Sequence, residues 1–238
     1  MSSSYKVTIS SISNLSSLQI IAINYVLLPL ISLVMFLLIA FDANQDYSRT
    51  LLGTVITSAI SSGIGVINTS FVYDQNIGIF DDVVSIRPNF GKYLLPKFVI
   101  ASLVTTSEVL LLGSIGLIAL NKYNLFSKLF AAIPLVVIIS SLLGFFGSVL
   151  GIKRNNPYWL TNIISGSLFL LAGIIIPISE YPQWLRIIAE ILPISNLLDW
   201  FNSAKVFDLN LEIVFIKCVI WFIICLFCYQ QLIFKLKK

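Results

Sequence analysis

The chain has no histidine and little charge: of its 238 residues, 11% are charged and 58% are hydrophobic. A soluble domain has about 25% charged and about 45–50% apolar residues, so this chain cannot form the polar surface of a soluble enzyme. The lack of histidine also removes the usual general base near neutral pH and the commonest metal ligand. With 12 glycines, 8 prolines and many aliphatic residues, collagen-like and disordered chains are excluded. The composition indicates an integral membrane protein.

Cysteine is scarce and the common catalytic motifs are missing. Cys218, Cys225 and Cys228 all lie in one apolar segment, and we interpret them as packing residues rather than as a redox or metal site. The sequence has no Gly-x-Ser-x-Gly, His-Glu-x-x-His or phosphate-binding Gly-x-x-x-x-Gly-Lys-Ser/Thr motif. We therefore expect no catalytic site and no cofactor in this chain. Energy for any transport has to come from a partner or from an ion gradient.

The sequence does contain apolar runs long enough to cross a bilayer, which takes about 20 residues. Consecutive apolar residues, as at positions 136–139 and 174–176, do not fit the alternation of a membrane β-barrel. The predicted fold class is therefore an all-α integral membrane protein, forming one transmembrane domain over residues 1–238. Its six predicted spans are residues 20–41, 51–73, 94–120, 127–152, 158–178 and 211–234.

The distribution of Lys and Arg predicts that both termini are cytoplasmic. With the N-terminus inside, the inner segments hold nine basic residues and the outer segments five, as the positive-inside rule requires. Lys122 and Lys128 fall on the wrong side, and Lys217 falls within the sixth span. Residues 1–19 are interpreted as a short cytoplasmic interfacial helix that leads into the first span.

Small residues recur at a spacing of four along the second span: Gly53, Thr57, Ser61, Gly65 and Thr69. Small residues let helices approach closely in lipid. Two interpretations stay open. The row either packs against helices of the same chain, or it forms a dimer seam or the polar wall of a translocation route.

Glu108 is the only acid deep inside a predicted span. A charged acid at bilayer depth costs about 2.5–3.5 kcal/mol on insertion scales. One interpretation is an acid that contacts substrate or couples transport to another event. The other is a neutral carboxyl group bonded to a hydroxyl, such as that of Thr105 or one in the second span.

The loop between the second and third spans, residues 74–88, is predicted to form a short amphipathic helix outside the membrane. Ile79 or Phe80 shares a face with Val83 and Val84. The opposite face carries aspartates, whereas helices that lie on lipid usually carry Lys and Arg there. A protein partner is therefore favoured over the lipid surface, which remains the alternative.

The segment after the fifth span is predicted to form two short interfacial or re-entrant helices at the outer end. Pro182 suits the first position of a helix that ends before Pro193. Arg186 and Glu190 would pair at i, i+4. The second helix, residues 196–201, contains Trp200, which we expect at the level of the lipid headgroups. The first helix has an apolar face formed by Trp184, Ile187, Ile188 and Ile191.

At these two loops the chain resembles the type-2 ABC transporter permeases (the ABC-2 family), which include membrane subunits that export drugs, peptides and polysaccharides. Residues 78–81 (Gly-Ile-Phe-Asp) and 86–88 (Ile-Arg-Pro) stand in the register of the family's Gly-Thr-Leu-Glu and Thr-Pro. The chain departs from the family at residues 74–76, where Asp-Gln-Asn replaces a Glu-Arg pair, and by one extra residue before Pro88. Further matches are Leu28-Pro29-Leu30 and, after the fifth span, Gly173, Pro177, Pro182, Trp184, Leu185 and Pro193.

The resemblance implies a permease subunit of an ATP-driven exporter in the plasma membrane of a bacterium. ATP and Mg²⁺ would be bound by a cytosolic ATP-binding-cassette subunit, and a second permease chain, identical or paralogous, would complete the complex. The expected cargo is an amphipathic small molecule or peptide. The residues expected to dock the ATP-binding subunit, as the coupling helix, are Gly78, Ile79, Phe80, Asp81, Val83, Val84 and Arg87. The expected substrate route is lined by Asn24, Tyr25, Ser58, Asn68, Phe71, Glu108, Trp159, Asn162 and Phe169.

Other functions stay open at this point. A gradient-driven secondary transporter or channel would show an inverted repeat and ionisable relays in the membrane; no repeat is apparent in this sequence. A non-transporting membrane anchor or immunity protein would fit the composition equally well. An intramembrane enzyme is disfavoured by the missing catalytic motifs. Co-purification with an ATPase would separate the exporter from the secondary transporter.

Overall fold

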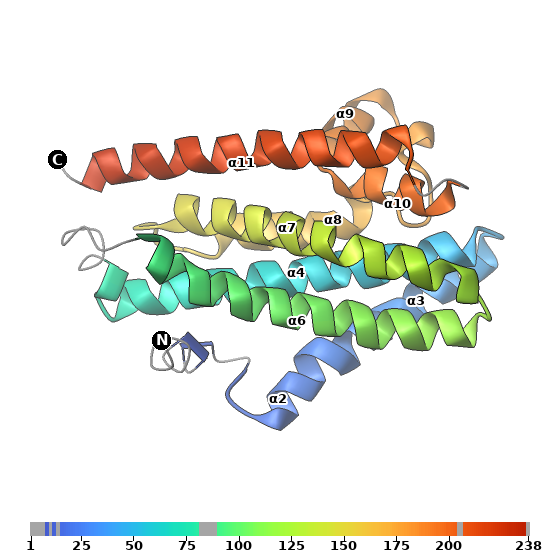
Figure 1. The fold of residues 1–238 in the computed structure, drawn as a ribbon, viewed down its shortest axis with the longest axis horizontal. Coiled ribbons are helices and arrows are strands. Elements are labelled where there is room, and N and C mark those ends of the chain that lie inside the picture. Colours follow the sequence, from blue (N-terminus) through green and yellow to red (C-terminus); the bar gives the residue numbers. More distant parts are fainter. Residues whose placement is uncertain (1–7, 10, 13–14, 81–89, 204–206, 237–238) are drawn as a thin grey trace.

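The structure, a computed structural model, describes residues 8–9, 11–12, 15–80, 90–203 and 207–236. Within these ranges all regular structure is helical, as the composition predicts, and the long helices lie along one common axis (Figure 1). Five helical segments are long and apolar enough to cross a membrane, and they correspond to five of the six predicted spans. They are Leu18–Asp42, composed of α2 (Leu18–Ala22), η2 (Ile23–Leu27) and α3 (Leu28–Asp42), then α4 (Tyr47–Asn76), α6 (Phe90–Ala119), α7 (Phe126–Gly151) and α11 (Leu209–Leu236).

The remaining predicted span, residues 158–178, contains a helix shorter than expected. This helix, α8, covers Trp159–Leu171. Its 13 residues extend about 20 Å, against about 30 Å for the hydrocarbon core of a bilayer. Gly173 takes a left-handed backbone conformation, at φ +68°, which ends the helix and leads into the 3-10 turn η4 (Ile178–Glu180). The prediction that the whole run is helical is therefore wrong, and a sixth crossing stays a prediction.

The first membrane-length segment contains a π-helical turn, η2, immediately before a proline. Pro29 lies at the start of α3, and in a regular helix its ring would collide with the carbonyl group four residues earlier. The wider turn relieves this clash, since the Leu28 N–H bonds to the Ile23 carbonyl, five residues back. Asn24 and Tyr25, two of the predicted route residues, lie within this turn.

α4 is the central helix of the bundle. Within its membrane-length window 83% of the residues are buried inside the chain, and it contacts α3, α6, α7, α8 and α10. Glycines allow the closest approaches. A Cβ on Gly63 would lie 2.4 Å from Thr105 Oγ1 of α6, and one on Gly144 of α7 would lie 3.1 Å from the Ile64 Cα. Such close packing is the main source of helix association in lipid.

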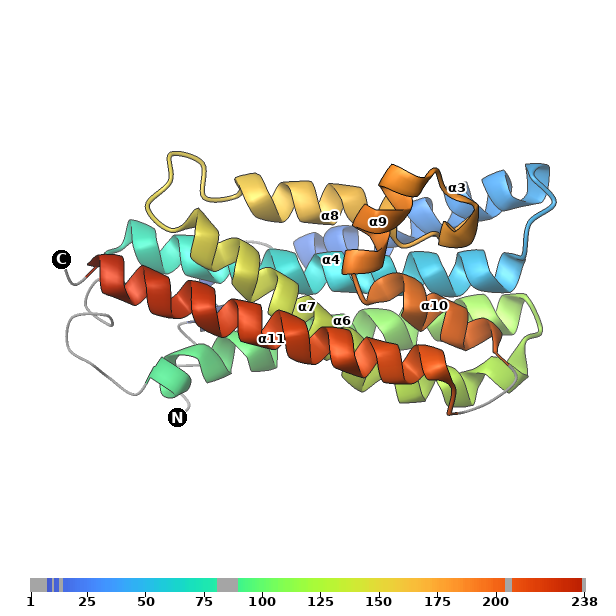
Figure 2. The same ribbon diagram turned by 90° about the horizontal axis from the view of Figure 1, so that it is seen from above.

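The two ends of the bundle differ. The loop end contains residues 77–80, the α7–α8 connection at residues 152–158 and the last turns of α11 (Figures 1 and 2). The cap end contains the turn after α3 and two short helices, α9 (Gln183–Ile191) and α10 (Ile194–Asn202). Ile12 packs in a cluster of side chains from the loop end. The first and the last described parts of the chain therefore lie at the same end.

The two short helices predicted after the fifth span are present at the cap end. α9 follows Pro182, and Arg186 Nε lies 2.7 Å from Glu190 Oε1, so the predicted i, i+4 pair is confirmed. α10 begins two residues before the predicted segment. Trp200 is only 1% exposed and belongs to the main core, because α10 packs on α4, α7 and α11. Trp200 therefore packs inside the bundle, and its position at the level of the lipid headgroups stays a prediction.

Three basic side chains from three long helices hold the cap in place. Arg49 of α4 bonds to Asp199 of α10 at 2.8 Å. Lys128 of α7 donates to backbone carbonyls at the C-terminal end of α10, where the helix dipole favours a cation. Lys217 of α11 donates to Asn196 Oδ1 at 2.5 Å. These contacts explain why Lys128 and Lys217 depart from the charge pattern used to predict orientation.

Candidate functional site

The predicted partner-binding segment begins at the loop end, directly after α4. Gly78 has a left-handed backbone, at φ +80°, and a Cβ there would meet no atom within 4 Å. Ile79 is partly exposed, whereas Phe80 is 2% exposed and packs on Phe71, with ring centroids 6.5 Å apart. Phe80 therefore faces the bundle rather than an open surface. The other residues predicted for this contact lie outside the described residues: Asp81, Val83, Val84 and Arg87.

Beside Phe71, a buried ion pair joins α4 to α6. Lys97 Nζ lies 2.6 Å from Asp74 Oδ2, and the two side chains are 2% and 6% exposed. The Tyr93 hydroxyl donates to the same carboxylate oxygen at 2.7 Å, and Lys97 also donates to Ser70 Oγ at 2.5 Å. The ammonium lies 4.7 Å from the centroid of the Tyr93 ring, within range of a cation–π contact. Both charges are thus paired and hydrogen-bonded, as burial requires.

This network corrects two sequence assignments. The second span is predicted to end at residue 73, but α4 continues to Asn76, so that Asp74 is a helical residue. Lys97, one of the nine basic residues assigned to the inner segments, lies inside α6. A lysine near the start of an apolar run indicates a buried partner, and this signal could have identified Lys97 as a site residue. The identity of the partner, 23 residues earlier in the chain, depends on the fold.

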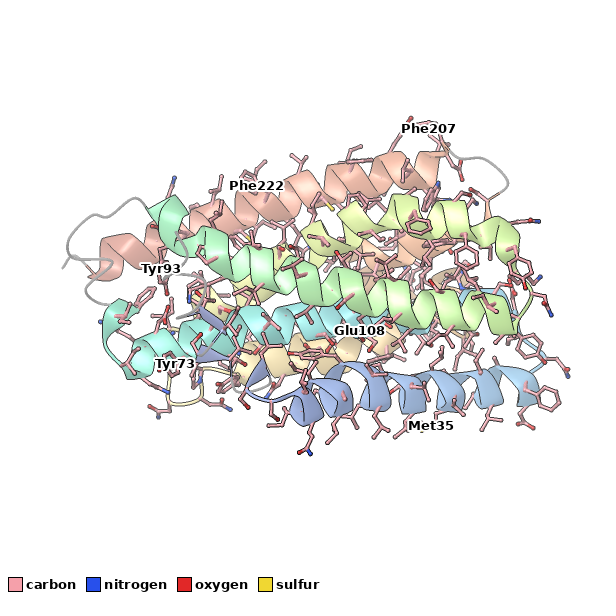
Figure 3. All side chains as sticks on the ribbon, turned by 60° about the horizontal axis from the view of Figure 1, so that its bottom comes forward. Met35, Tyr73, Tyr93, Glu108, Phe207 and Phe222 are labelled. Carbon is pink, nitrogen blue, oxygen red and sulfur yellow. The ribbon has the colours of Figure 1, made fainter. Side chains whose placement is uncertain are left out.

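Glu108 lies midway along α6, in the interior of the bundle (Figure 3). The residue is 1% exposed, and the Ser58 hydroxyl of α4 donates to its Oε1 at 2.6 Å. The sequence offered Thr105 or a hydroxyl of the second span as the donor to Glu108, and the structure shows that the second span supplies it. Thr105 bonds instead to the Ala59 carbonyl at 3.4 Å. Glu108 and Ser58, both predicted route residues, are in contact but are enclosed within one chain.

The row of small residues on α4 divides into two parts. Near the cap end, a Cβ on Gly53 would lie 3.1 Å from Leu198 and 3.2 Å from Ile174, so this part packs within the chain. Further along, a Cβ on Gly65 would meet nothing within 4 Å. Ser61, Gly65 and Thr69 are all partly exposed. Packing within the chain is therefore confirmed for the half of the row near the cap end, whereas the other half leaves a short polar strip of α4 partly exposed. A dimer seam or a route wall at this strip stays a prediction. This polar strip consists of Ser61, Gly65 and Thr69.

The other predicted route residues differ in exposure. Asn68 is 2% exposed and donates from Nδ2 to Thr161 Oγ1 of α8 at 2.7 Å. Trp159 is 39% exposed, and Asn162 on the same helix is also exposed. Within the π-helical turn, Asn24 is partly exposed and Tyr25 is 8% exposed. Phe71 is fully buried.

The predicted route residues thus fall into two main sets. The exposed set is Trp159 and Asn162, and the buried set is Tyr25, Ser58, Asn68, Phe71 and Glu108.

A cavity of about 560 Å³ lies between α3 and α8, near the cap end. Phe36 and Phe169 line it and stack with centroids 5.4 Å apart and an interplanar angle of 7°. Gly166 and Tyr181 also line the cavity, and the Tyr181 hydroxyl donates to the Leu170 carbonyl at 2.7 Å. Phe169 is the one predicted route residue on this wall. The lining is mostly apolar with few polar atoms, as in sites for amphipathic ligands.

The described part of the chain contains no cluster of three His, Cys, Asp or Glu side chains that could hold a metal ion. In comparisons with known proteins, the family model described as "ABC-2 type transporter" matches residues 7–205. No curated protein and no solved structure matches the chain.

Proposed function

The chain belongs to the ABC-2 type transporter family and is a multi-pass membrane permease, and we propose that it is the membrane subunit of an ATP-driven exporter. In this proposal residues 1–238 form one transmembrane domain in a bacterial plasma membrane, with the loop end in the cytosol. A separate cytosolic subunit binds ATP and Mg²⁺. The cargo is an amphipathic small molecule or peptide, which suits the mostly apolar walls of the α3–α8 cavity.

The observation that carries the proposal is the family match over residues 7–205. The loop end supports it with a physical path for force. Residues 77–80 leave α4 directly after the Asp74–Lys97 pair, and Phe80 packs on Phe71. Phe80 thus joins the connection to α4, and the Asp74–Lys97 pair joins α4 to α6, so a partner that pushes on the connection would move both helices together. Coupling through packed, hydrogen-bonded elements is the usual physical basis for such transmission.

The exposed set of route residues supports the position proposed for the route. Beside the polar strip, Asn68 of α4 donates to Thr161 of α8, and α4 contacts α8 directly. Trp159 and Asn162 are exposed residues of the same helix α8. Small polar residues left uncovered in a membrane helix are typical of helix–helix interfaces. In the proposal, a second permease chain faces this strip and the cargo passes between the two chains. Ser58, Asn68, Phe71 and Glu108 then support the wall from within rather than touch cargo.

The proposal can be tested with the chain purified in mild detergent. ATP hydrolysis is expected to co-purify with it. An Ile79→Asp variant is expected to lose most of this activity, because Ile79 is a partly exposed residue of the predicted docking segment. Ile187→Asp, which alters an exposed isoleucine of α9 at the cap end, is the matched control and should keep the activity. Both variants should elute as monodisperse protein.

Transport in sealed vesicles gives the second readout. ATP together with the co-purified subunit should be required for cargo movement, and an ion gradient alone should have no effect. Transport driven by a gradient without nucleotide would overturn the exporter assignment and favour a secondary transporter.

A further inference from the structure

A polar cavity at the cap end lies apart from the proposed route. Its volume is about 410 Å³, and α9, α10 and α11 supply most of its walls. The polar strip and the α3–α8 cavity involve other elements, namely α3, α4 and α8. Its lining residues are Ile178, Ser179, Arg186, Glu190, Asn196, Asp199, Ile213 and Lys217.

When Arg49 behind the wall is counted with the lining residues, three cations and two carboxylates surround this cavity. Arg186 pairs with Glu190 at the exposed rim, and Asp199 pairs with Arg49 behind the wall. Lys217 is left over: among the described residues its Nζ meets no carboxylate oxygen within 4 Å. Its two hydrogen-bond acceptors are the neutral Asn196 Oδ1 at 2.5 Å and a backbone carbonyl at 3.4 Å. An ammonium group has three donors, so one remains for an anion in the cavity.

The cavity continues into an exposed aliphatic surface on the same face of α11. Ile213, Lys217, Ile220 and Ile224 are separated by four, three and four positions, which places them on one side of a helix. The three isoleucines are 37%, 50% and 37% exposed. α11 is a membrane-length helix, so this surface meets acyl chains. A ligand that fills both parts needs an anionic head and an aliphatic tail.

We propose that this cavity binds a phospholipid, with the phosphodiester group on Lys217 and Arg186 and an acyl chain along Ile213, Ile220 and Ile224. The tail contact distinguishes a bilayer lipid from a free phosphate ion, which would use the cations alone. Charge-assisted hydrogen bonds from a partly buried ammonium to a phosphate oxygen are among the stronger ones in proteins. This site is independent of the export route and of the ATP-binding partner.

The test measures lipid binding to the purified full chain after delipidation in detergent. Phosphatidylglycerol should raise the thermal midpoint in a saturable way, and native mass spectrometry should show one retained lipid per chain. Lys217→Gln should raise the lipid concentration needed for half-saturation by about tenfold, the loss of affinity expected for one charge-assisted hydrogen bond. Arg186→Gln, which leaves the contacts of Lys217 intact, should weaken it less. Lys122→Gln removes an exposed cation at the same end of the bundle and should leave binding unchanged.

Three results would overturn the assignment. Equal effects of diacylglycerol and phosphatidylglycerol would show that the headgroup is not recognised. A full effect of inorganic phosphate would show that the lipid tail is not recognised. Unchanged lipid retention in both Lys217→Gln and Arg186→Gln would remove the cavity from consideration. If Lys217→Gln fails to fold, Arg186→Gln and the charge-preserving Lys217→Arg variant decide the question, with retained binding expected for Lys217→Arg.

Discussion

The loop end and the cap end of this bundle both bury charged side chains, but they use them differently. At the loop end, Lys97 and Asp74 are 2% and 6% exposed and neutralise each other between two long helices. At the cap end, Lys128 and Lys217 donate mainly to backbone carbonyls and an amide, and Arg49 meets an Asp199 side chain that is 33% exposed. The charges of the loop end join α4 to α6, whereas those of the cap end attach short helices to the bundle.

The difference indicates what each end can do. Removal of one partner from a buried ion pair costs about 3–5 kcal/mol, because the other charge is left uncompensated. The loss of a hydrogen bond to a charged group costs about 1.5–3 kcal/mol. The loop end should therefore move as one rigid unit, which suits the transmission of force. The cap end should loosen locally without loss of the bundle.

The largest effect is expected for Lys97→Met. It leaves Asp74 buried without its counter-charge and should lower the free energy of unfolding by about 3–5 kcal/mol, measured by thermal or denaturant unfolding in detergent. The double variant with Asp74→Asn should recover a large part of this loss, since no uncompensated charge remains. A double variant as unstable as Lys97→Met would contradict the ion-pair explanation.

A smaller and more local effect is expected for Arg49→Met. Arg49 Nε donates to the Gly173 carbonyl at 3.0 Å, in addition to the bond with Asp199, so the variant should lose about 1.5–3 kcal/mol. Hydrogen exchange should rise in residues 173–203 and stay unchanged at the start of α6. Uniform loss of protection along the whole chain would show that the cap is not a separable unit.

The middle of the bundle offers a comparison with both ends. Ser58→Ala removes the hydroxyl that donates to Glu108 and should cost about 1–3 kcal/mol, the usual penalty for a buried polar atom that loses its partner. Glu108→Gln keeps a side chain of the same shape and should preserve folding and expression if the carboxyl group is normally neutral. Collapse of expression in Glu108→Gln would show that a charged carboxylate is needed here.

The smallest structural effect is expected from cysteines at Gln183 and Asn155, which are exposed at the cap end and the loop end. Exposed substitutions of this kind usually change stability by no more than about 0.5 kcal/mol. An impermeant thiol reagent applied to intact cells should label the cysteine at position 183 from outside, and the one at position 155 only after permeabilisation. The reverse pattern would invert the proposed orientation of both ends.

Much of the architecture could be predicted because it depends on local periodicity. Hydropathy located five membrane-length helices, since burial in lipid needs only a long apolar run. The pair Arg186–Glu190 also follows from spacing, because four residues bring two side chains together on any helix. Even here the limit is visible at α8: Gly173 ended the helix within a run that remains apolar on both sides.

The candidate site was less predictable, because its residues are defined by contacts between distant segments. The sequence showed that small residues line one side of α4. Only the packing of the helices decided that Gly53 is covered and Gly65 is not. Phe80 was expected on a docking surface and instead packs on Phe71. An aromatic side chain in a connection can turn either way, and the choice depends on the apolar surface that the neighbouring helices present.

By itself, then, the sequence determined that the chain is a helical membrane protein of the ABC-2 type and where most of its long helices lie. Composition and periodicity act through the transfer of each segment into lipid, which is a local property of the chain. Only the tertiary structure decided that Lys97 pairs with Asp74, that Ser58 bonds to Glu108 and that Lys217 bonds to the neutral Asn196. Polar groups in a membrane interior must find partners wherever the packed helices bring them, and that position is not encoded in spacing along the chain.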